Sequence, residues 1–239
     1  MRILTVDTSS QAGGIAILED SRVVLNVFER SGEEYSSRLF RQLDLLLKET
    51  CLKLSDFDLF AVAAGPGSFT GLRIGMTAVK AWAEVFGKPI SPVSGLKALA
   101  AQAIRKTEYI AAFMDARRGQ IFGGLFRHRD GKLIEIGDEV VMRPDEFLGE
   151  ISVRLQSQPG SKQLQNLIGF VSPTLDLIPV GSSGSELHNA PSEKVSEDLA
   201  PWIGRLAFEQ AQRGETATAL ALDANYIRRS DAEQYWKES

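Results

Sequence analysis

The sequence predicts an α/β fold with two lobes, in which mixed sheets are flanked by helices. Three observations lead to this fold class: helix-like and strand-like segments alternate, three short strands open the chain, and a wholly apolar strand runs into a glycine-rich turn before a helix. The 239 residues, 44% of them hydrophobic, are enough for one large domain or two small lobes. We expect a first lobe over residues 1–105, completed by about 215–239, and a smaller lobe over 106–214.

The opening half of the chain shows its elements most clearly. Residues 2–7 and 13–18 are apolar runs on either side of the polar turn 8–11, a pattern typical of a β-hairpin. Pro89 sets the end of the second helix, because proline cannot continue a helix. The elements expected after the hairpin are a strand at 22–28, a helix from about 34 to 51, a strand at 59–64, a helix from about 70 to 86, a strand at 90–93 and a helix from about 96 to 105.

The second half carries weaker patterns. Residues 109–114 and 120–127 predict paired strands joined by a turn that contains Gly119. Beyond residue 150 most segments are polar and rich in Ser, Gly and Pro, which predicts loops. The expected segments there are loops at 154–166 and 181–198, a helix near 199–213, and a polar tail at 224–239 that carries Arg228 and Arg229.

Composition excludes several classes of protein. The formal net charge is −4, whereas an autonomous RNA binder usually carries a basic footprint, so in an RNA pathway we expect a partner to hold the RNA. No apolar run approaches the roughly 18–20 residues that span a bilayer, and the first residues lack the layout of a signal peptide. The single cysteine, Cys51, excludes an internal disulfide. We expect a cytoplasmic protein with no membrane association.

Asp7 is the first candidate for chemistry, together with Thr8 and Ser9 in the turn that follows it. The aspartate ends an apolar strand, and in actin-like ATPases an aspartate at this place helps to position a metal while the following turn contacts phosphate. The alternative is an aspartate that caps its own turn through hydrogen bonds to the backbone. The residues alone leave both interpretations open.

The most distinctive segment is a glycine-rich turn between a strand and a helix, formed by Gly65, Gly67, Ser68, Thr70, Gly71 and Gly75. It is neither a Walker A loop, since no Lys-Ser or Lys-Thr follows the glycines, nor a GxGxxG motif. Ser68 or Thr70 can cap the helix, and the exposed amides could hold an anion. Gly71 and Gly75 lie on one helical face and permit close approach of a backbone, either that of a partner or that of the chain itself.

The first long helix has a stripe predicted to be buried, formed by Leu39, Phe40, Leu43, Leu46 and Leu47. Leu45 falls outside this stripe, beside Arg41 and Lys48. Combined with the glycine face of the second helix, this leucine indicates a helical contact surface, although one exposed leucine is also ordinary.

No catalytic constellation is evident. His128 and His188 are isolated, and no ligands stand at metal-site spacing, so we expect no metal. Cys51 has no nearby histidine that would activate it, and a small hydrophobe is its expected role. No GxSxG or SxxK motif is present.

Several segments together resemble the family of the tRNA threonylcarbamoyladenosine biosynthesis protein TsaB, also called YeaZ. They are ILTVDTSS at the start, AGPGSFTGLRIGMTAVKAWA, VSGLKALA, MDARRGQIF and the closing ALDANYIRRSDAEQYW. The resemblance covers residues 1–127 well, and GPGSFTGLRIG is its most specific part. It implies an actin-like ATPase (ASKHA, ribonuclease H-like) fold with two lobes.

The resemblance also implies a function. The family supports threonylcarbamoyl transfer to adenosine 37 of tRNAs that read ANN codons, without catalytic activity or a cofactor of its own. Its members pair with the transferase TsaD, join the ATPase TsaE, self-associate when alone, and meet tRNA only through the complex. The family makes these contacts through the helices of the first lobe. The partner-binding residues expected on this basis are Leu39, Leu43, Leu45, Arg73, Met76, Thr77 and Lys80.

A comparison within the resemblance accounts for the missing chemistry. TsaD holds a metal with two histidines four residues apart, and the corresponding positions here are Gly95 and Leu99, neither of which can ligate. Asp7 would then be a relic or a weak nucleotide contact. The alternatives are an active actin-like ATPase or small-molecule kinase, which Asp7 favours, and a peptidase, for which the sequence offers neither a nucleophile with a base nor a metal.

Overall fold

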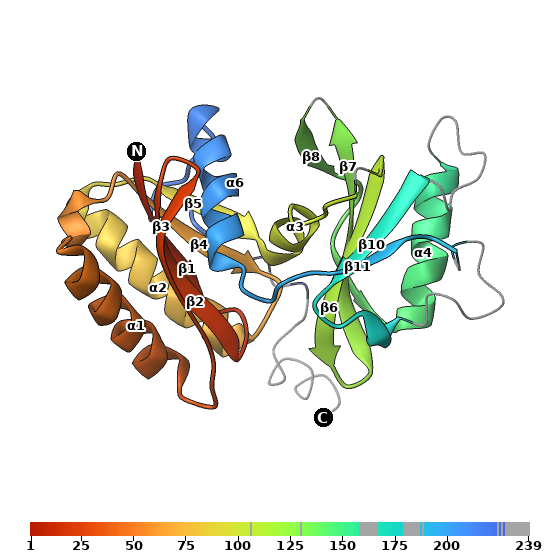
Figure 1. Cartoon of the computed structure of the whole chain (residues 1–239), viewed down its shortest axis with the longest axis horizontal. Helices are drawn as coiled ribbons and strands as arrows, with labels where there is room; N and C mark the ends of the chain where they lie inside the picture. The colour runs from red at the N-terminus through yellow and green to blue at the C-terminus, as the bar shows by residue number, and fades with distance from the viewer. Residues whose placement is uncertain are drawn as a thin grey trace. The chain divides into compact units, whose positions relative to one another are not determined.

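The structure is a computed structural model of the chain. It describes residues 1–105, 107–129, 131–157, 167–178, 187, 189–223, 225 and 227. His188, Arg228 and Arg229, discussed above, lie outside the described residues. The chain divides into two compact units, Met1–Ala98 with Glu197–Ser239, and Leu99–Ser196, each built around one sheet (Figure 1).

The first unit contains a five-stranded mixed sheet. Its strand order is β3-β2-β1-β4-β5, with antiparallel pairing among the first three strands and parallel pairing of β1 with β4 and of β4 with β5. The predicted hairpin is confirmed, and Asp7 at the end of β1 pairs with Gly14. The strands are β1 (Arg2–Asp7), β2 (Ala12–Glu19), β3 (Arg22–Arg30), β4 (Leu59–Gly65) and β5 (Ile90–Ser94).

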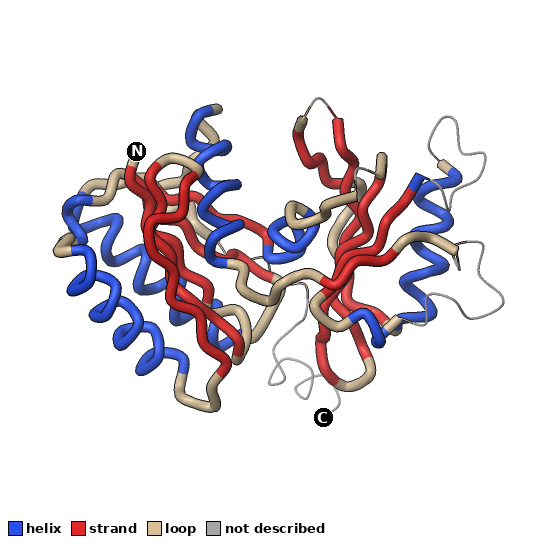
Figure 2. The backbone as a smooth tube through the Cα atoms, in the orientation of Figure 1, coloured by secondary structure: helices blue, strands red, loops and turns tan. Residues whose placement is uncertain are grey.

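Two long helices cover one face of this sheet and a third covers the other (Figures 1 and 2). The first pair are α1 (Tyr35–Thr50) and α2 (Phe69–Phe86), and a short 3₁₀ turn at Leu54–Asp56 links α1 to β4. Side chains of α1, α2 and the strands form one apolar core between helices and sheet. The sequence predicts both helices to within one or two residues, and the wholly buried β4 strand as well.

Helix α6 (Ala200–Gln212) packs on the opposite face, against β1, β2, β4 and β5. Gly204 lets it approach closely, because a Cβ at this position would meet the side chains of Leu18 and Thr5. The expected boundary at residue 214 assigns this helix to the smaller lobe; in the structure it completes the first unit instead. The physical reason is that the sheet has two apolar faces, and α1 and α2 cover only one of them.

The third predicted helix is shorter than expected. Helix α3 (Gly95–Ala100) ends five residues early, because the amides of Gln102 and Ala103 bond carbonyls only three residues back, which forms turns in place of a continued helix.

The second unit has a mixed six-stranded sheet in the order β11-β10-β6-β7-β8, with β9 also paired to β7. Helix α4 (Pro144–Gln156) packs on this sheet, where Phe147 fills the space above Gly123. The core lies between α4 and the strands. The strands are β6 (Tyr109–Arg117), β7 (Gln120–Arg129), β8 (Lys132–Glu135), β9 (Val140–Met142), β10 (Ile168–Ser172) and β11 (Ser192–Lys194), with a 3₁₀ turn at Leu175–Leu177.

Two expectations for this unit need correction. The expected loop 154–166 begins inside α4, and its positions 158–166 lie outside the described residues. The expected loop 181–198 contains strand β11, although most of its first half is not described. Across the described part of the chain, the helices are too short or too polar to span a bilayer.

Candidate functional site

Asp7 ends strand β1 with only 2% of its surface exposed. Its Oδ1 accepts a hydrogen bond of 2.9 Å from the backbone N–H of Ser9. Burial raises the pKa of the Asp7 carboxyl, while its hydrogen bonds with Ser9 and the positive charge of Arg38 act in the opposite direction. The carboxylate therefore caps its own turn, which is one of the two roles that the sequence left open.

The turn after Asp7 is joined directly to the start of α2. The hydroxyl of Thr8 donates to the carbonyl of Gly71 at 2.7 Å, and the amide of Ser68 donates to the carbonyl of Ser9 at 2.6 Å. The two segments singled out in the sequence, residues 7–9 and the glycine-rich turn, thus form one hydrogen-bonded unit.

The glycines of this turn are required by contacts inside the chain. A Cβ on Gly67 would lie less than 3.0 Å from the carbonyl of Ser9, and a Cβ on Gly71 or Gly75 would lie less than 3.0 Å from Thr8. Such distances are not accessible to real side chains. The close approach that Gly71 and Gly75 permit is therefore occupied by the chain's own hairpin turn, the second of the two uses considered above.

The remaining residues of the turn hold its shape. Gly65 has φ of +124°, a conformation that favours glycine, and its missing Cβ leaves room for the carbonyl of Asn225. The Gly65–Pro66 peptide is cis. Ser68, one of the two predicted caps, accepts a 3.2 Å hydrogen bond from the amide of Gly71, whereas Thr70 is exposed.

Arg38 is a part of this site that the sequence analysis missed. It is 1% exposed on α1, and its guanidinium donates to the carbonyl of Ser10 at 2.9 Å and to that of Gln11. Gly13 makes room for this group, because a Cβ there would lie less than 3.0 Å from Nη2. The available signal was its position one residue before Leu39, at the margin of the buried stripe.

Three of the expected partner-binding residues need correction. Leu39, Leu43 and Met76 are 1%, 7% and 5% exposed and belong to the core between helices and sheet, so they cannot form an outer surface. Phe40, assigned to the buried stripe, is 53% exposed. Phe40 lies at the margin of the stripe, on a side of the helix that is exposed to solvent.

The other expected partner residues lie at the surface. Leu45 is 44% exposed, Arg73 and Thr77 are exposed, and Lys80 is half-buried. Four of the exposed positions of α2 are spaced four residues apart, Arg73, Thr77, Ala81 and Val85, while Thr70 and Glu84 are also exposed. We call this row of four the outer stripe of α2.

Within the described ranges, no three or more His, Cys, Asp and Glu side chains gather at distances that would suit a metal. Gly95 and Leu99, which occupy the positions of metal ligands in the resemblance, lie on α3.

The comparisons with known proteins decide the family. A family model described as TsaD, tRNA N6-adenosine threonylcarbamoyltransferase, matches residues 27–221. The tRNA threonylcarbamoyladenosine biosynthesis protein TsaB of Bacillus subtilis is 32% identical over 253 residues, which cover 100% of this chain and 99% of that protein. The chain belongs to the TsaB family. The Escherichia coli TsaB is 34% identical over 150 residues, which cover 61% of this chain and 64% of that protein.

Solved structures show that this TsaB-family chain has an actin-like fold. YeaZ from Pseudomonas aeruginosa superposes with a TM-score of 0.69 at 25% identity, covering 94% of this chain and 100% of that chain. The fold extends beyond the family: a ROK hexokinase from Thermus thermophilus gives a TM-score of 0.52 at 11% identity, covering 89% of this chain and 100% of that chain.

Proposed function

We propose that this chain is a non-catalytic subunit required for threonylcarbamoyl transfer to adenosine 37 of tRNAs that read ANN codons. A role in tRNA threonylcarbamoyladenosine formation follows from membership of the TsaB family. In the proposed complex the chain pairs with TsaD and recruits the ATPase TsaE, and it forms a homodimer when alone.

The observation that carries this proposal is the outer stripe of α2. Only three of the eighteen residues of α2 are charged, Arg73, Lys80 and Glu84. Val85 in the stripe is 75% exposed, and on neighbouring α1 Phe40 and Leu45 are exposed as well. An exposed helix face with so few charges is typical of a surface that a partner covers.

Asp7 supports a role without catalysis. The carboxyl is almost fully buried, and its Oδ1 already accepts the Ser9 amide, so in the described structure it serves the turn that it caps. A residual contact of residues 7–9 with nucleotide in the complex remains part of the proposal. A thermal-shift titration of the isolated chain with Mg-ATP tests the non-catalytic role. A rise of several degrees in the unfolding temperature would favour an active ATPase or kinase instead.

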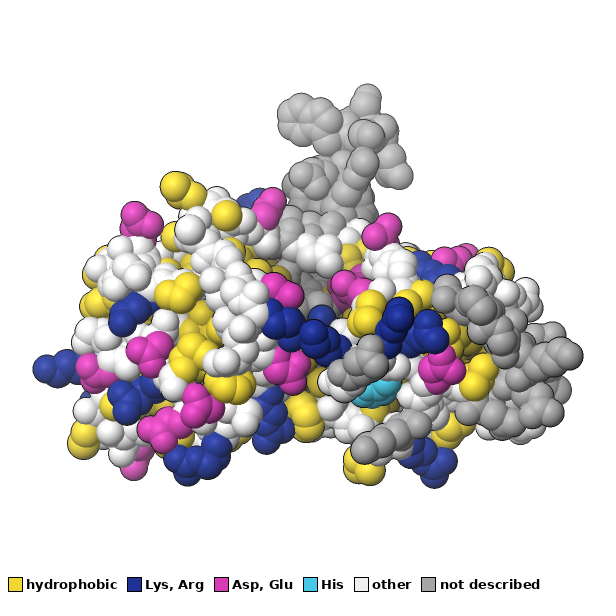
Figure 3. All heavy atoms as spheres, turned by 90° about the horizontal axis from the view of Figure 1, so that it is seen from above, with side chains coloured by type: hydrophobic (Ala, Val, Ile, Leu, Met, Phe, Trp, Pro, Cys, Tyr) yellow, Lys and Arg dark blue, Asp and Glu magenta, His cyan; other side chains and the backbone are white. Residues whose placement is uncertain are grey.

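Charge supports indirect contact with tRNA. The net charge is −4, and on the face drawn in Figure 3 the basic and acidic side chains of the described residues are interspersed. Binding to the phosphate backbone draws on clustered lysines and arginines. We infer that tRNA is held by another subunit.

The decisive experiment reconstitutes tRNA modification from TsaD, TsaE and this chain. Modified adenosine should be absent without this chain, and the chain alone should produce none. Val85→Arg should reduce both the affinity for TsaD and the modification rate tenfold or more, because an interface core excludes an unpaired charge. Val153→Arg is the matched control, since Val153 is a 60% exposed valine on helix α4. Full activity of TsaD and TsaE without this chain would refute the proposal.

A further inference from the structure

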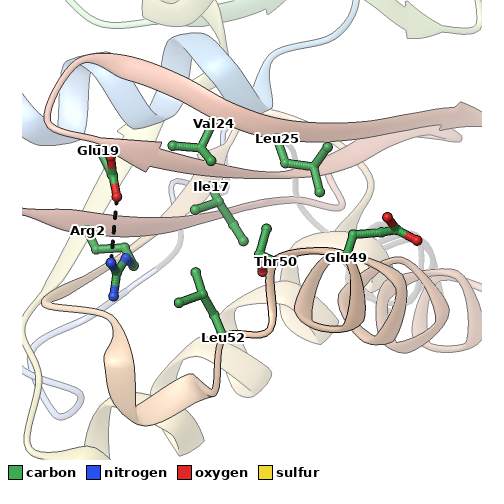
Figure 4. Close-up of a pocket in the computed structure, with 8 residues that line it drawn as sticks. All are labelled: Arg2, Ile17, Glu19, Val24, Leu25, Glu49, Thr50 and Leu52. Atoms are coloured by element: carbon green, nitrogen blue, oxygen red, sulfur yellow. Dashed lines mark ion pairs between the residues drawn. The ribbon is translucent and has the colours of Figure 1, made fainter.

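A pocket lies at the C-terminal end of α1, in a place that the proposed pairing through α2 does not use. It has a volume of about 470 Å³, within the range of ligand-binding pockets. Figure 4 shows strands β1 to β3 on one side and the end of α1 on the other. The lining residues are Arg2, Ile17, Glu19, Val24, Leu25, Glu49, Thr50 and Leu52.

A β-bulge shapes the wall formed by β3. Ile17 pairs with Leu25 and Leu18 pairs with Val23, which leaves Val24 as an extra residue without a partner across the strand pair. Both Val24 and Leu25 therefore line the pocket, although successive strand residues normally point to opposite faces. The bulge places a second apolar side chain here, and Val24 stays 41% exposed.

The charges around the pocket leave one carboxylate uncompensated. Glu19 lies 3.6 Å from Arg2 and 2.8 Å from Arg22, so these charges offset one another. Glu49 has no hydrogen bond or ion pair to any described residue, and it stands in the last turn of α1, where the helix carbonyls already carry partial negative charge. The pocket thus combines apolar lining residues with a carboxylate, that of Glu49, which a cation could neutralise.

The adjacent strand edge favours a protein segment as the occupant. Strand β3 ends the sheet, and among the described strands it pairs only with β2. Its outer backbone groups can receive an extended chain, whose side chains would then enter the pocket. A free small molecule would use the pocket but not this edge.

We propose that the pocket docks an extended segment of a partner protein that presents a large apolar side chain two residues away from a lysine or arginine, because alternate side chains of an extended chain point to the same face. The apolar side chain packs on Val24, Leu25 and Leu52, and the cation pairs with Glu49. This contact is independent of the pairing through α2, so either proposal can fail alone.

The test is an NMR titration of the ¹⁵N-labelled full chain with two acetylated and amidated tetrapeptides, Leu-Val-Lys-Val and Leu-Val-Glu-Val. The lysine peptide should shift the amides of Val24, Leu25 and residues 49–52, with an affinity about three- to fivefold above that of the glutamate peptide. In Glu49→Gln the preference should fall to near unity. In the control Glu135→Gln, an exposed glutamate on β8, it should persist.

Two results would overturn the docking proposal. Equal binding of both peptides to the wild-type chain, or no shift at these amides, would show that charge and pocket do not select a segment. If isoamylamine binds with the same affinity as the lysine peptide, the pocket binds small amines and not a protein segment. A circular dichroism spectrum of Glu49→Gln that matches the wild type establishes that the variant is folded.

Discussion

At the scale of single residues, the glycines of the glycine-rich turn allow two segments of the chain to pack closely together. Thr8 fills the face of α2 that Gly71 and Gly75 leave open, and its hydroxyl bonds the Gly71 carbonyl across that contact. The hairpin turn and the start of α2 therefore hold each other in place. The glycines matter for stability whether or not nucleotide ever reaches this turn.

Gly71→Ala should destabilise the chain by about 1–3 kcal/mol, because the added methyl overlaps the Thr8 carbonyl and backbone cannot easily yield. Gly149→Ala is the matched control, since Gly149 lies on helix α4 with nothing within 4 Å of a built Cβ. That change should be neutral or stabilise by roughly 0.5–1 kcal/mol through helix propensity. Urea unfolding of both variants measures the difference, and equal midpoints would contradict the packing account.

Asp7 should make stability depend on pH. Because burial raises its pKa, the folded chain binds this proton more tightly than the unfolded chain does. The resulting stabilisation is fully present below about pH 3.9, the unfolded value, and is lost as pH rises through the folded pKa. Asp7→Asn keeps an acceptor for the Ser9 amide but removes the titration.

The expected result is a free energy of unfolding that falls less between about pH 4 and pH 7 in Asp7→Asn than in the wild type. Urea titrations at several pH values measure it. Asp176→Asn, a change at an exposed carboxylate, should run parallel to the wild type. A steeper fall in Asp7→Asn would show that the carboxylate is stabilising as an anion.

Sequence reasoning finds residues whose role is local and misses those whose role depends on distant partners. Ser68 is one of the two caps predicted from sequence, with Thr70, and in the structure it accepts a hydrogen bond from the amide three residues on. Arg38 could not be assigned, since its carbonyl partners are 27 and 28 residues away and an arginine beside a stripe usually points to solvent. The helical stripe correctly predicts the burial of Leu39 and Leu43, and it is their expected partner-binding role that this burial contradicts.

At the scale of elements, helix α2 could be predicted because both of its ends carry local signals. Helix α2 begins after Ser68 and ends at Gly87, which adopts φ of +62°, and both signals are readable. Helix α4 also has its signals, with Pro144 at its start and a stripe of Phe147, Ile151 and Leu155. These signals are few, and the end of the helix overlaps the polar stretch after residue 154, whose composition is typical of a loop.

Arg38 ties α1 to the β1–β2 turn, and this tie can be tested. Arg38→Met keeps much of the side-chain volume but removes the guanidinium hydrogen bonds to the carbonyls of Ser10 and Gln11, although the Gln11 carbonyl still accepts the Ser31 amide, so we expect a loss of about 1–3 kcal/mol. Arg22→Met removes an exposed ion pair with Glu19 and should change stability by no more than about 0.5 kcal/mol. Chemical denaturation of both variants makes the comparison, and similar losses would remove any special role for Arg38.

At the scale of the molecule, the first unit is assembled from two distant parts of the chain. Helix α6 packs on the sheet face opposite α1 and α2, although more than a hundred residues separate it from β5. The helical pattern near 199–213 is readable in sequence, but periodicity states only that one face is buried, not which sheet buries it. Assignment to the nearer lobe was therefore the expected error.

This arrangement predicts how the chain responds to truncation. Without residues 197–239, the sheet face that includes Leu18 would be exposed to water, and the hydrogen bond between Ser91 and Gln210 would be lost. A chain that ends at Ser196 should therefore lose cooperative unfolding of the first unit. The matched control is a chain in which residues 1–98 are joined to 197–239 through a flexible Gly-Ser linker, and it should retain cooperative unfolding. Far-ultraviolet circular dichroism during urea unfolding compares the two chains. Cooperative unfolding of the first unit in both chains would show that it folds without α6 and would contradict the prediction.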